Sequence, residues 1–167
     1  THRLATAYGE SISDPAGGLT HVFPSVAQLA EMDPTRLAFP ESRRRTLVAL
    51  IDALAAGTVE LDAGSDWLHA RTQLAELPGI GPWTAEVVAM RALGDPDAFP
   101  ASDLGVQTAA KQLGLPDNPR LLLEHSAQWR PWRAYATQHL WTSLDHAVNQ
   151  WPPLTTNPTP SPQQEQA

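Results

Sequence analysis

The segment Gly79-Ile80-Gly81-Pro82 is the part of the sequence best suited to hold a ligand against the backbone. Glycine adopts backbone angles closed to other residues and leaves no Cβ between the chain and a ligand. Pro82 suits the first position of a helix, where its missing N–H costs nothing. Free N–H groups at the positive end of a helix bind phosphate, so we expect a phosphate site here. The same letters also fit an ordinary corner between two helices.

One carboxylate, Asp103, follows this hairpin after a Pro-rich loop. A carboxylate can stabilise the positive charge that develops on a sugar as its base departs, and it can orient or deprotonate water. A position at the start of a helix favours the ionised form. The local sequence leaves a second interpretation open, in which Asp103 only caps the next helix and Ser102 competes for that role.

Helical periodicity predicts the elements that position these residues. Residues 66–93 read as two helices around the hairpin, capped by Ser65 or Asp66 and ended by Gly94. Further helices are expected over residues 1–8, 25–32, 41–56, 104–113, 120–126 and 131–148. Alternating β patterns are missing from the sequence, which predicts an all-α fold. We expect one helical domain over residues 1–150, and a disordered tail rich in Pro and Gln over residues 151–167.

Composition excludes several classes of protein. The 167 residues contain no cysteine, which rules out disulfides, thiolate zinc sites and iron–sulfur clusters. The histidines show no ligand spacing, so we predict no catalytic metal. No membrane span or signal peptide is visible, which predicts a cytoplasmic protein, associated with the nucleoid if the source is bacterial. The net charge of −7 argues mildly against nucleic-acid binding, although ten of the eleven basic residues are arginines and several are clustered.

Three motifs in order resemble one known family: Leu77 to Ala85, Phe99 to Asp103, and Trp129 to Trp141. The chain is similar from about Leu4 to Trp141 to the helix-hairpin-helix DNA glycosylases, and within them to the 3-methyladenine DNA glycosylase II family. The resemblance implies that fold without its N-terminal part, because the family carries a helix and a wedge loop before the residues that match Tyr8. A chain that starts at Thr1 without Met also suggests an excised piece.

The resemblance implies an activity and assigns residues to it. Asp103 matches the catalytic aspartate, and Trp83 stands where lyase-capable relatives have the lysine that forms an imine. This predicts a monofunctional enzyme that uses water to remove alkylated purines, of the 3-methyladenine type, from duplex DNA in base excision repair. Trp83, Trp141 and Tyr135 are expected to line the base pocket, since a flipped base needs a stacking surface.

For binding to the DNA backbone, the resemblance points to Gly79, Ile80, Gly81 and Thr84. It implies no cofactor beyond a monovalent cation on the hairpin carbonyls when DNA is bound. The expected partner is double-stranded DNA with damaged bases, and we expect a monomer.

Two alternatives stay open. A helix-hairpin-helix module that binds DNA without catalysis would need the glycines but no buried carboxylate. A glycosylase acting on mismatched or oxidised bases is the other, and the absence of cysteine and the presence of Trp83 instead of lysine count against it.

Overall fold

The computed structural model describes residues 2–14, 17–62 and 64–145, and this part of the chain is all-α, as predicted. Its only recorded β pairing is an isolated bridge between Ser11 and His21. None of the helices in these ranges is long and apolar enough to cross a membrane. The tail predicted for residues 151–167 lies outside the described residues. The last helix, predicted to run to Val148, ends at Thr142, because the N–H of Ser143 caps it on the carbonyl of His139.

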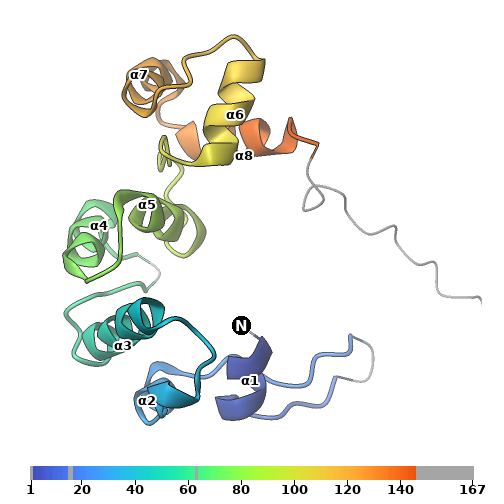
Figure 1. The fold of residues 1–167 in the computed structure, drawn as a ribbon, viewed down its shortest axis with the longest axis vertical. Helices are drawn as coiled ribbons and strands as arrows, with labels where there is room; N and C mark the ends of the chain where they lie inside the picture. The colour runs from blue at the N-terminus through green and yellow to red at the C-terminus, as the bar shows by residue number, and fades with distance from the viewer. Residues whose placement is uncertain (1, 15–16, 63, 146–167) are drawn as a thin grey trace, which may run out of the picture.

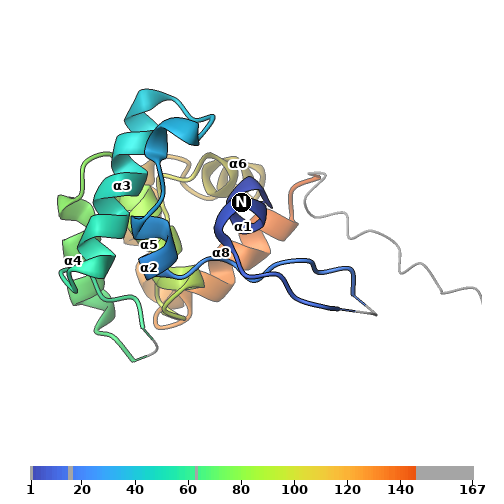
Figure 2. The same cartoon turned by 90° about the horizontal axis from the view of Figure 1, so that it is seen from below.

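The N-terminal half begins with short elements around a longer helix. Helix α1 spans His2–Tyr8, α2 spans Val26–Ala30, the 3-10 helix η1 spans Pro34–Arg36, and α3 spans Glu41–Ala55. Ser25 and Gln28 form a capping box that starts α2. The segment between α1 and α2 extends away from the helices as an arm (Figure 2). Hydrogen bonds pair its two sides, for example from the N–H of Val22 to the carbonyl of Glu10 at 2.9 Å.

The predicted hairpin unit consists of α4, Trp67–Glu76, and α5, Pro82–Arg91. Asp66 is the cap of α4, because its carboxylate accepts the N–H groups of Leu68 and His69 at 2.8 and 2.9 Å. The two helices pack on each other, and α3 adds Ala53 to a buried cluster that contains Leu74 and Ile80. Ile80 therefore points inward, as the sequence predicted, and ties the hairpin to its flanking helices.

The C-terminal part comprises α6, Leu104–Gln112, α7, Pro119–His125, the 3-10 helix η2, Ser126–Trp129, and α8, Arg133–Thr142. Helices α6 and α8 pack together around a core that includes Val106 and Leu140, with Trp141 at its edge. Helix α8 was predicted to begin at about Pro131, whereas it begins at Arg133, two residues later.

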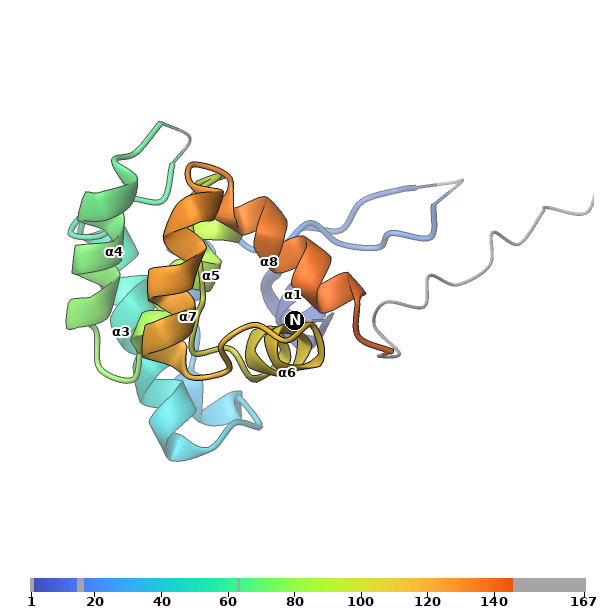
Figure 3. The ribbon, with the colours of Figure 1, turned by 90° about the horizontal axis from the view of Figure 1, so that it is seen from above.

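Along the long axis of the molecule, α2 and α3 lie at one end, α4 and α5 in the middle, and α6 to α8 at the other end (Figure 1). Seen from above, α8 passes across the end that also holds α6 and α7 (Figure 3). The loop from residue 92 to residue 103 joins the middle to the far end, and it carries Asp103 at its last position.

Candidate active site

Asp103 accepts hydrogen bonds from two tryptophans that are distant in the sequence. The indole N–H of Trp83 donates to Oδ2 at 2.7 Å, and the indole N–H of Trp141 donates to Oδ1 at 2.8 Å. The backbone N–H of Val106 also donates to Oδ1, at 2.9 Å. Asp103 is therefore the N-cap of α6 and at the same time the centre of a paired-indole site, so the two interpretations of its role are compatible.

Three helices supply this arrangement. Trp83 stands in the first turn of α5, directly after the hairpin, and Trp141 stands near the end of α8. Gly105 permits the close packing, because a Cβ at this position would lie 3.0 Å from Oδ1 of Asp103 and 3.2 Å from Cδ1 of Trp141. Gly105 was not predicted from the sequence, since nothing local distinguishes it from other helical residues.

The hydrogen bonds hold the carboxyl group of Asp103 in its charged form. Its partial burial raises the pKa, but the donors Trp141, Val106 and Trp83 outweigh burial, and the pKa of Asp103 lies below its ordinary value. The site thus presents a fixed negative charge between two aromatic side chains at neutral pH.

The glycine hairpin combines a glycine in the left-handed region with a helix start that has no side-chain cap. Gly79 has a φ of +84°, and a Cβ there would lie 2.1 Å from Oγ1 of Thr46 on α3. Gly81 is the N-cap of α5, which in the described structure receives no side-chain cap. The first N–H groups of α5, those of Trp83 and Thr84, are therefore left for a ligand.

The predicted pocket residues differ in their surroundings. Trp83 is 45% exposed, whereas Trp141 is half-buried and has the guanidinium of Arg91 over its ring, 5.5 Å from the centroid. Tyr135 is 60% exposed and packs edge-on against Trp132. Tyr135 lines a groove with Arg91 and Gln138, and the lining of this groove includes none of Asp103, Trp83 and Trp141. The role of Tyr135 in base binding stays a prediction.

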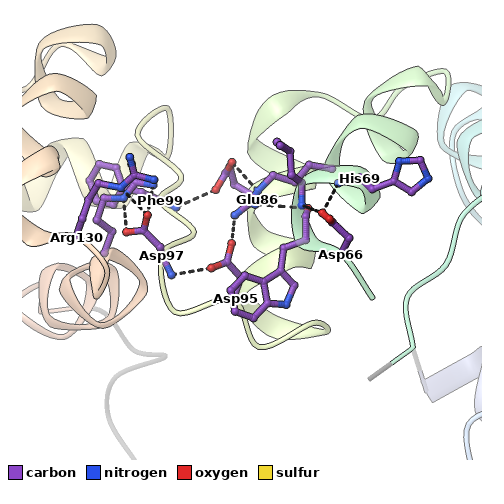
Figure 4. Close-up of polar contacts among 11 residues, drawn as sticks. Asp66, His69, Glu86, Asp95, Asp97, Phe99 and Arg130 are labelled. Carbon is purple, nitrogen blue, oxygen red and sulfur yellow. Dashed lines mark hydrogen bonds and ion pairs between the residues drawn. The ribbon is translucent and has the colours of Figure 1, made fainter. Parts of the chain in front are cut away.

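A cluster of charged side chains holds the loop before Asp103 (Figure 4). Arg71 of α4 forms ion pairs with Glu86 and Asp95, and Glu86 accepts the backbone N–H of Phe99 at 2.8 Å. Asp97 is paired with Arg130 and Arg133, so its carboxylate offsets part of the positive charge of these two clustered arginines. Acidic residues in a loop between helices gave no signal for these contacts in the sequence.

No group of three or more His, Asp or Glu side chains in the described ranges could hold a metal ion. The candidate cation site on the hairpin carbonyls involves no side chain and remains a prediction.

No protein-family profile matches the chain. Among characterised sequences, it is 65% identical over 151 residues, 90% of its length, to a Mycobacterium tuberculosis protein named probable bifunctional transcriptional activator/DNA repair enzyme AlkA. It is 33% identical to the Escherichia coli DNA-3-methyladenine glycosylase 2 over 84% of the chain. The chain covers 30% of the first relative and 49% of the second, so it spans half or less of the length of each.

Solved structures share the fold. The Clostridium acetobutylicum 8-oxoguanine glycosylase/lyase in complex with DNA superposes with a TM-score of 0.70 at 20% identity, over 84% of this chain and 50% of that one. The Schizosaccharomyces pombe 3-methyladenine DNA glycosylase in complex with abasic DNA gives a TM-score of 0.64 at 25% identity, over 75% of this chain and 65% of that one.

Proposed function

We propose that this chain, which belongs to the helix-hairpin-helix DNA glycosylases and within them to the 3-methyladenine DNA glycosylase II family, carries the catalytic site of a monofunctional DNA N-glycosylase. Its substrate is an alkylated purine of the 3-methyladenine type in duplex DNA. The observation that carries the proposal is the contact of Trp83 and Trp141 with the carboxylate of Asp103. A module that only binds DNA has no use for an ionised carboxylate beside aromatic rings.

The proposed reaction breaks the bond between C1′ of the sugar and the purine nitrogen. The bonding electrons leave with the base, and positive charge develops on the sugar next to Asp103, which stabilises it. Water then adds to C1′ and its proton passes to the solvent, which leaves a neutral abasic sugar. Oδ1 already accepts two hydrogen bonds and Oδ2 accepts the one from Trp83, so Oδ2 has capacity left to orient this water.

Alkylation at a ring nitrogen gives the purine a positive charge, which an aromatic face attracts. Trp83 offers the more exposed ring, whereas Trp141 already has the cationic Arg91 over it. We therefore assign the main stacking surface for the base to Trp83. Trp141 would form a wall of the base pocket, and Tyr135 would lie at its outer edge. The alkylated base is a good leaving group, so strong protonation by the protein is not needed.

Binding to the DNA backbone is assigned to Gly79, Ile80, Gly81 and Thr84. The uncapped N-terminus of α5 donates its N–H groups to a phosphate, and the same turn carries Trp83. Phosphate contact and base contact are thereby fixed to each other by one helical turn. We expect the protein to act as a monomer on DNA in the cytoplasm.

The test is incubation of the 167-residue chain with alkylated duplex DNA and identification of the released bases by mass. Release of methylated purines that leaves abasic sites without strand breaks is expected. Duplex binding without release would favour the non-catalytic module, and release of oxidised or mismatched bases only would favour the other specificity.

A further inference from the structure

We propose that Asp97 and Arg133 are positioning residues, which fasten the start of α8 to the loop that carries Asp103 and thereby bring Trp141 to the carboxylate. This inference rests on the proposed function for its kinetic consequence, but the geometry it describes can be measured without activity. Neither residue touches the Asp103 site directly, so the effect is transmitted through α8.

The ion pair between Asp97 and Arg133 ties the start of α8 to the loop. Nε and Nη2 of Arg133 donate to the two carboxylate oxygens of Asp97 at 2.6 and 2.8 Å, and Arg130 adds a third bond at 2.8 Å. Both Asp97 and Arg133 have side chains that are only 16% exposed. A two-pronged arginine–carboxylate pair fixes orientation as well as distance, which a single contact does not do. Asp97 and Arg130 lie side by side in Figure 4.

A second contact holds the start of α8 to the loop. No side chain caps this helix in the described structure, and its N-cap residue is Trp132. Instead, the N–H of Ala134 donates to the carbonyl of Pro96 at 2.9 Å. The loop therefore supplies the acceptor that a capping side chain normally provides. The first turn of α8 is held to the neighbours Pro96 and Asp97 by two independent contacts.

The position of the first turn is transmitted along α8 to Trp141. Ala134 and Trp141 are about two turns apart and share one face of the helix. Because a helix is rigid over this length, fixing its first turn on the loop fixes where Trp141 lies. Trp141 then donates to Asp103, which ends the same loop. The loop and α8 are thus joined at both ends, and the middle of the loop is anchored separately by Glu86 through the Phe99 N–H.

The surface ion pair between Arg120 and Glu124 has no connection to the loop or to α8 in the described structure. Arg120 and Glu124 lie on the exposed face of α7 at 3.9 Å, with side chains that are 81% and 62% exposed. A neutral substitution of Glu124 removes an ion pair without altering any contact between the loop and α8, so it is a suitable control.

Asp97→Asn and Arg133→Lys are the test variants, with Glu124→Gln as the control. Asn keeps the size of the Asp97 side chain but loses its charge. Lys keeps the positive charge of Arg133 but loses the guanidinium group that contacts both carboxylate oxygens. In single-turnover assays on alkylated duplex we expect each test variant to lower the rate of base release by about 10- to 100-fold, the scale of a misplaced catalytic group. Affinity for the duplex should change less than about twofold, because the hairpin is untouched.

Two further measurements separate positioning from a loss of stability. In a Trp141→Phe background, Asp97→Asn should have a much smaller effect than alone, because its influence passes through Trp141. The indole N–H resonance of Trp141, assigned by its loss in Trp141→Phe, should shift in both test variants and stay in place in Glu124→Gln.

An unchanged Trp141 resonance in both test variants would overturn the inference, and so would full additivity in the double variant. If the unmodified chain releases no base, the proposed function fails. The shift of the Trp141 indole N–H resonance still decides whether Asp97 and Arg133 position Trp141. If Asp97→Asn does not fold, Arg133→Lys, which retains a charge and most of the side chain, provides the same comparison.

Discussion

The indole nitrogen of Trp83 lies 2.7 Å from Oδ2 of Asp103. This hydrogen bond joins the first turn of α5 to the last residue of the loop before α6. In lyase-capable relatives of the family the position of Trp83 holds a lysine. The tryptophan replaces a nucleophile by a neutral donor, and that donor helps to keep Asp103 ionised. The side chain of Trp83 cannot form an imine, so it is consistent with the proposed hydrolytic mechanism.

Asp103→Asn should lower base release by at least about 100-fold while duplex affinity is preserved, because the charge that stabilises the sugar cation is lost. Asparagine is as good an N-cap as aspartate, so α6 should keep its start. Quantifying the released base by mass, next to a duplex-binding titration, provides the check. Release at the unmodified rate would remove Asp103 from the catalytic role.

The lowered pKa of Asp103 predicts how activity depends on pH. Hydrogen bonds outweigh burial and favour the carboxylate, so titration of Asp103 should not reduce base release between neutral pH and about pH 5, above the ordinary value of about 3.9. A loss of activity that begins near pH 6, and that is absent only when Asp103 is substituted, would contradict this. Single-turnover rates across the range give the measurement.

The same shift predicts a stability effect with a defined sign. The folded-state pKa lies below the unfolded one, so the ionised group stabilises the fold above about pH 3.9, and this contribution is lost as the pH falls through the folded value. The difference in unfolding free energy between the unmodified chain and Asp103→Asn should therefore be larger at pH 7 than in acid. Urea titrations at pH 7 and near pH 3.5 test it.

The sequence was sufficient for the parts of the molecule that depend on local rules. Capping residues, glycine stops and apolar spacing predicted α3, α4 and α5, and the burial of Ile80 followed from its place between glycines. The pairing of Asp103 with Trp83 and Trp141 was reachable only through the resemblance, because hydrogen bonds between distant residues leave no local pattern.

Other features were beyond sequence reasoning for physical reasons. Helix α8 starts at Arg133 because the Pro96 carbonyl accepts the N–H of Ala134, a contact made only in the folded chain. Gly105 looks like an ordinary helical residue until two side chains from elsewhere approach it. The clustered arginines Arg130 and Arg133 both pair with Asp97, which lies in a distant part of the sequence, so no local pattern indicates these contacts.

Gly105→Ala should impair the site without touching a functional side chain. The new Cβ would lie 3.0 Å from Oδ1 of Asp103 and 3.2 Å from Trp141, so one of them must move by a few tenths of an ångström. Alanine improves helix propensity by up to about 1 kcal/mol, which offsets part of the strain. We expect base release to fall about 10-fold or more with a small change in melting temperature, and an unchanged rate would show that the contact has slack.

Gly79→Ala should weaken duplex binding through the shape of the hairpin. A left-handed backbone costs a non-glycine residue about 1–2 kcal/mol, and the new Cβ would also meet Thr46 Oγ1 at 2.1 Å. Gly114→Ala is the matched control, because Gly114 has a φ of +70° and open space around it. The loss of stability should be larger at Gly79, with reduced affinity for damaged and undamaged duplexes alike, since phosphate contacts carry no sequence information. Equal effects at the two glycines would contradict the packing argument.

Trp83→Lys should introduce weak strand cleavage. The new amine would stand beside Asp103, where Trp83 now donates its hydrogen bond, and near the sugar carbon in the proposed complex. The neighbouring carboxylate favours the protonated amine, whereas imine formation needs the neutral one, so cleavage should be slow and should increase with pH. A denaturing gel of end-labelled alkylated duplex, with borohydride trapping of the covalent complex, is the measurement. Trp83→Phe, which keeps a ring but no donor, should release base slowly and never nick the strand. Continued base release by Trp83→Lys without any trapped complex up to about pH 9 would mean that residue 83 does not reach the sugar, and the stacking role assigned to Trp83 would then have to be reassigned.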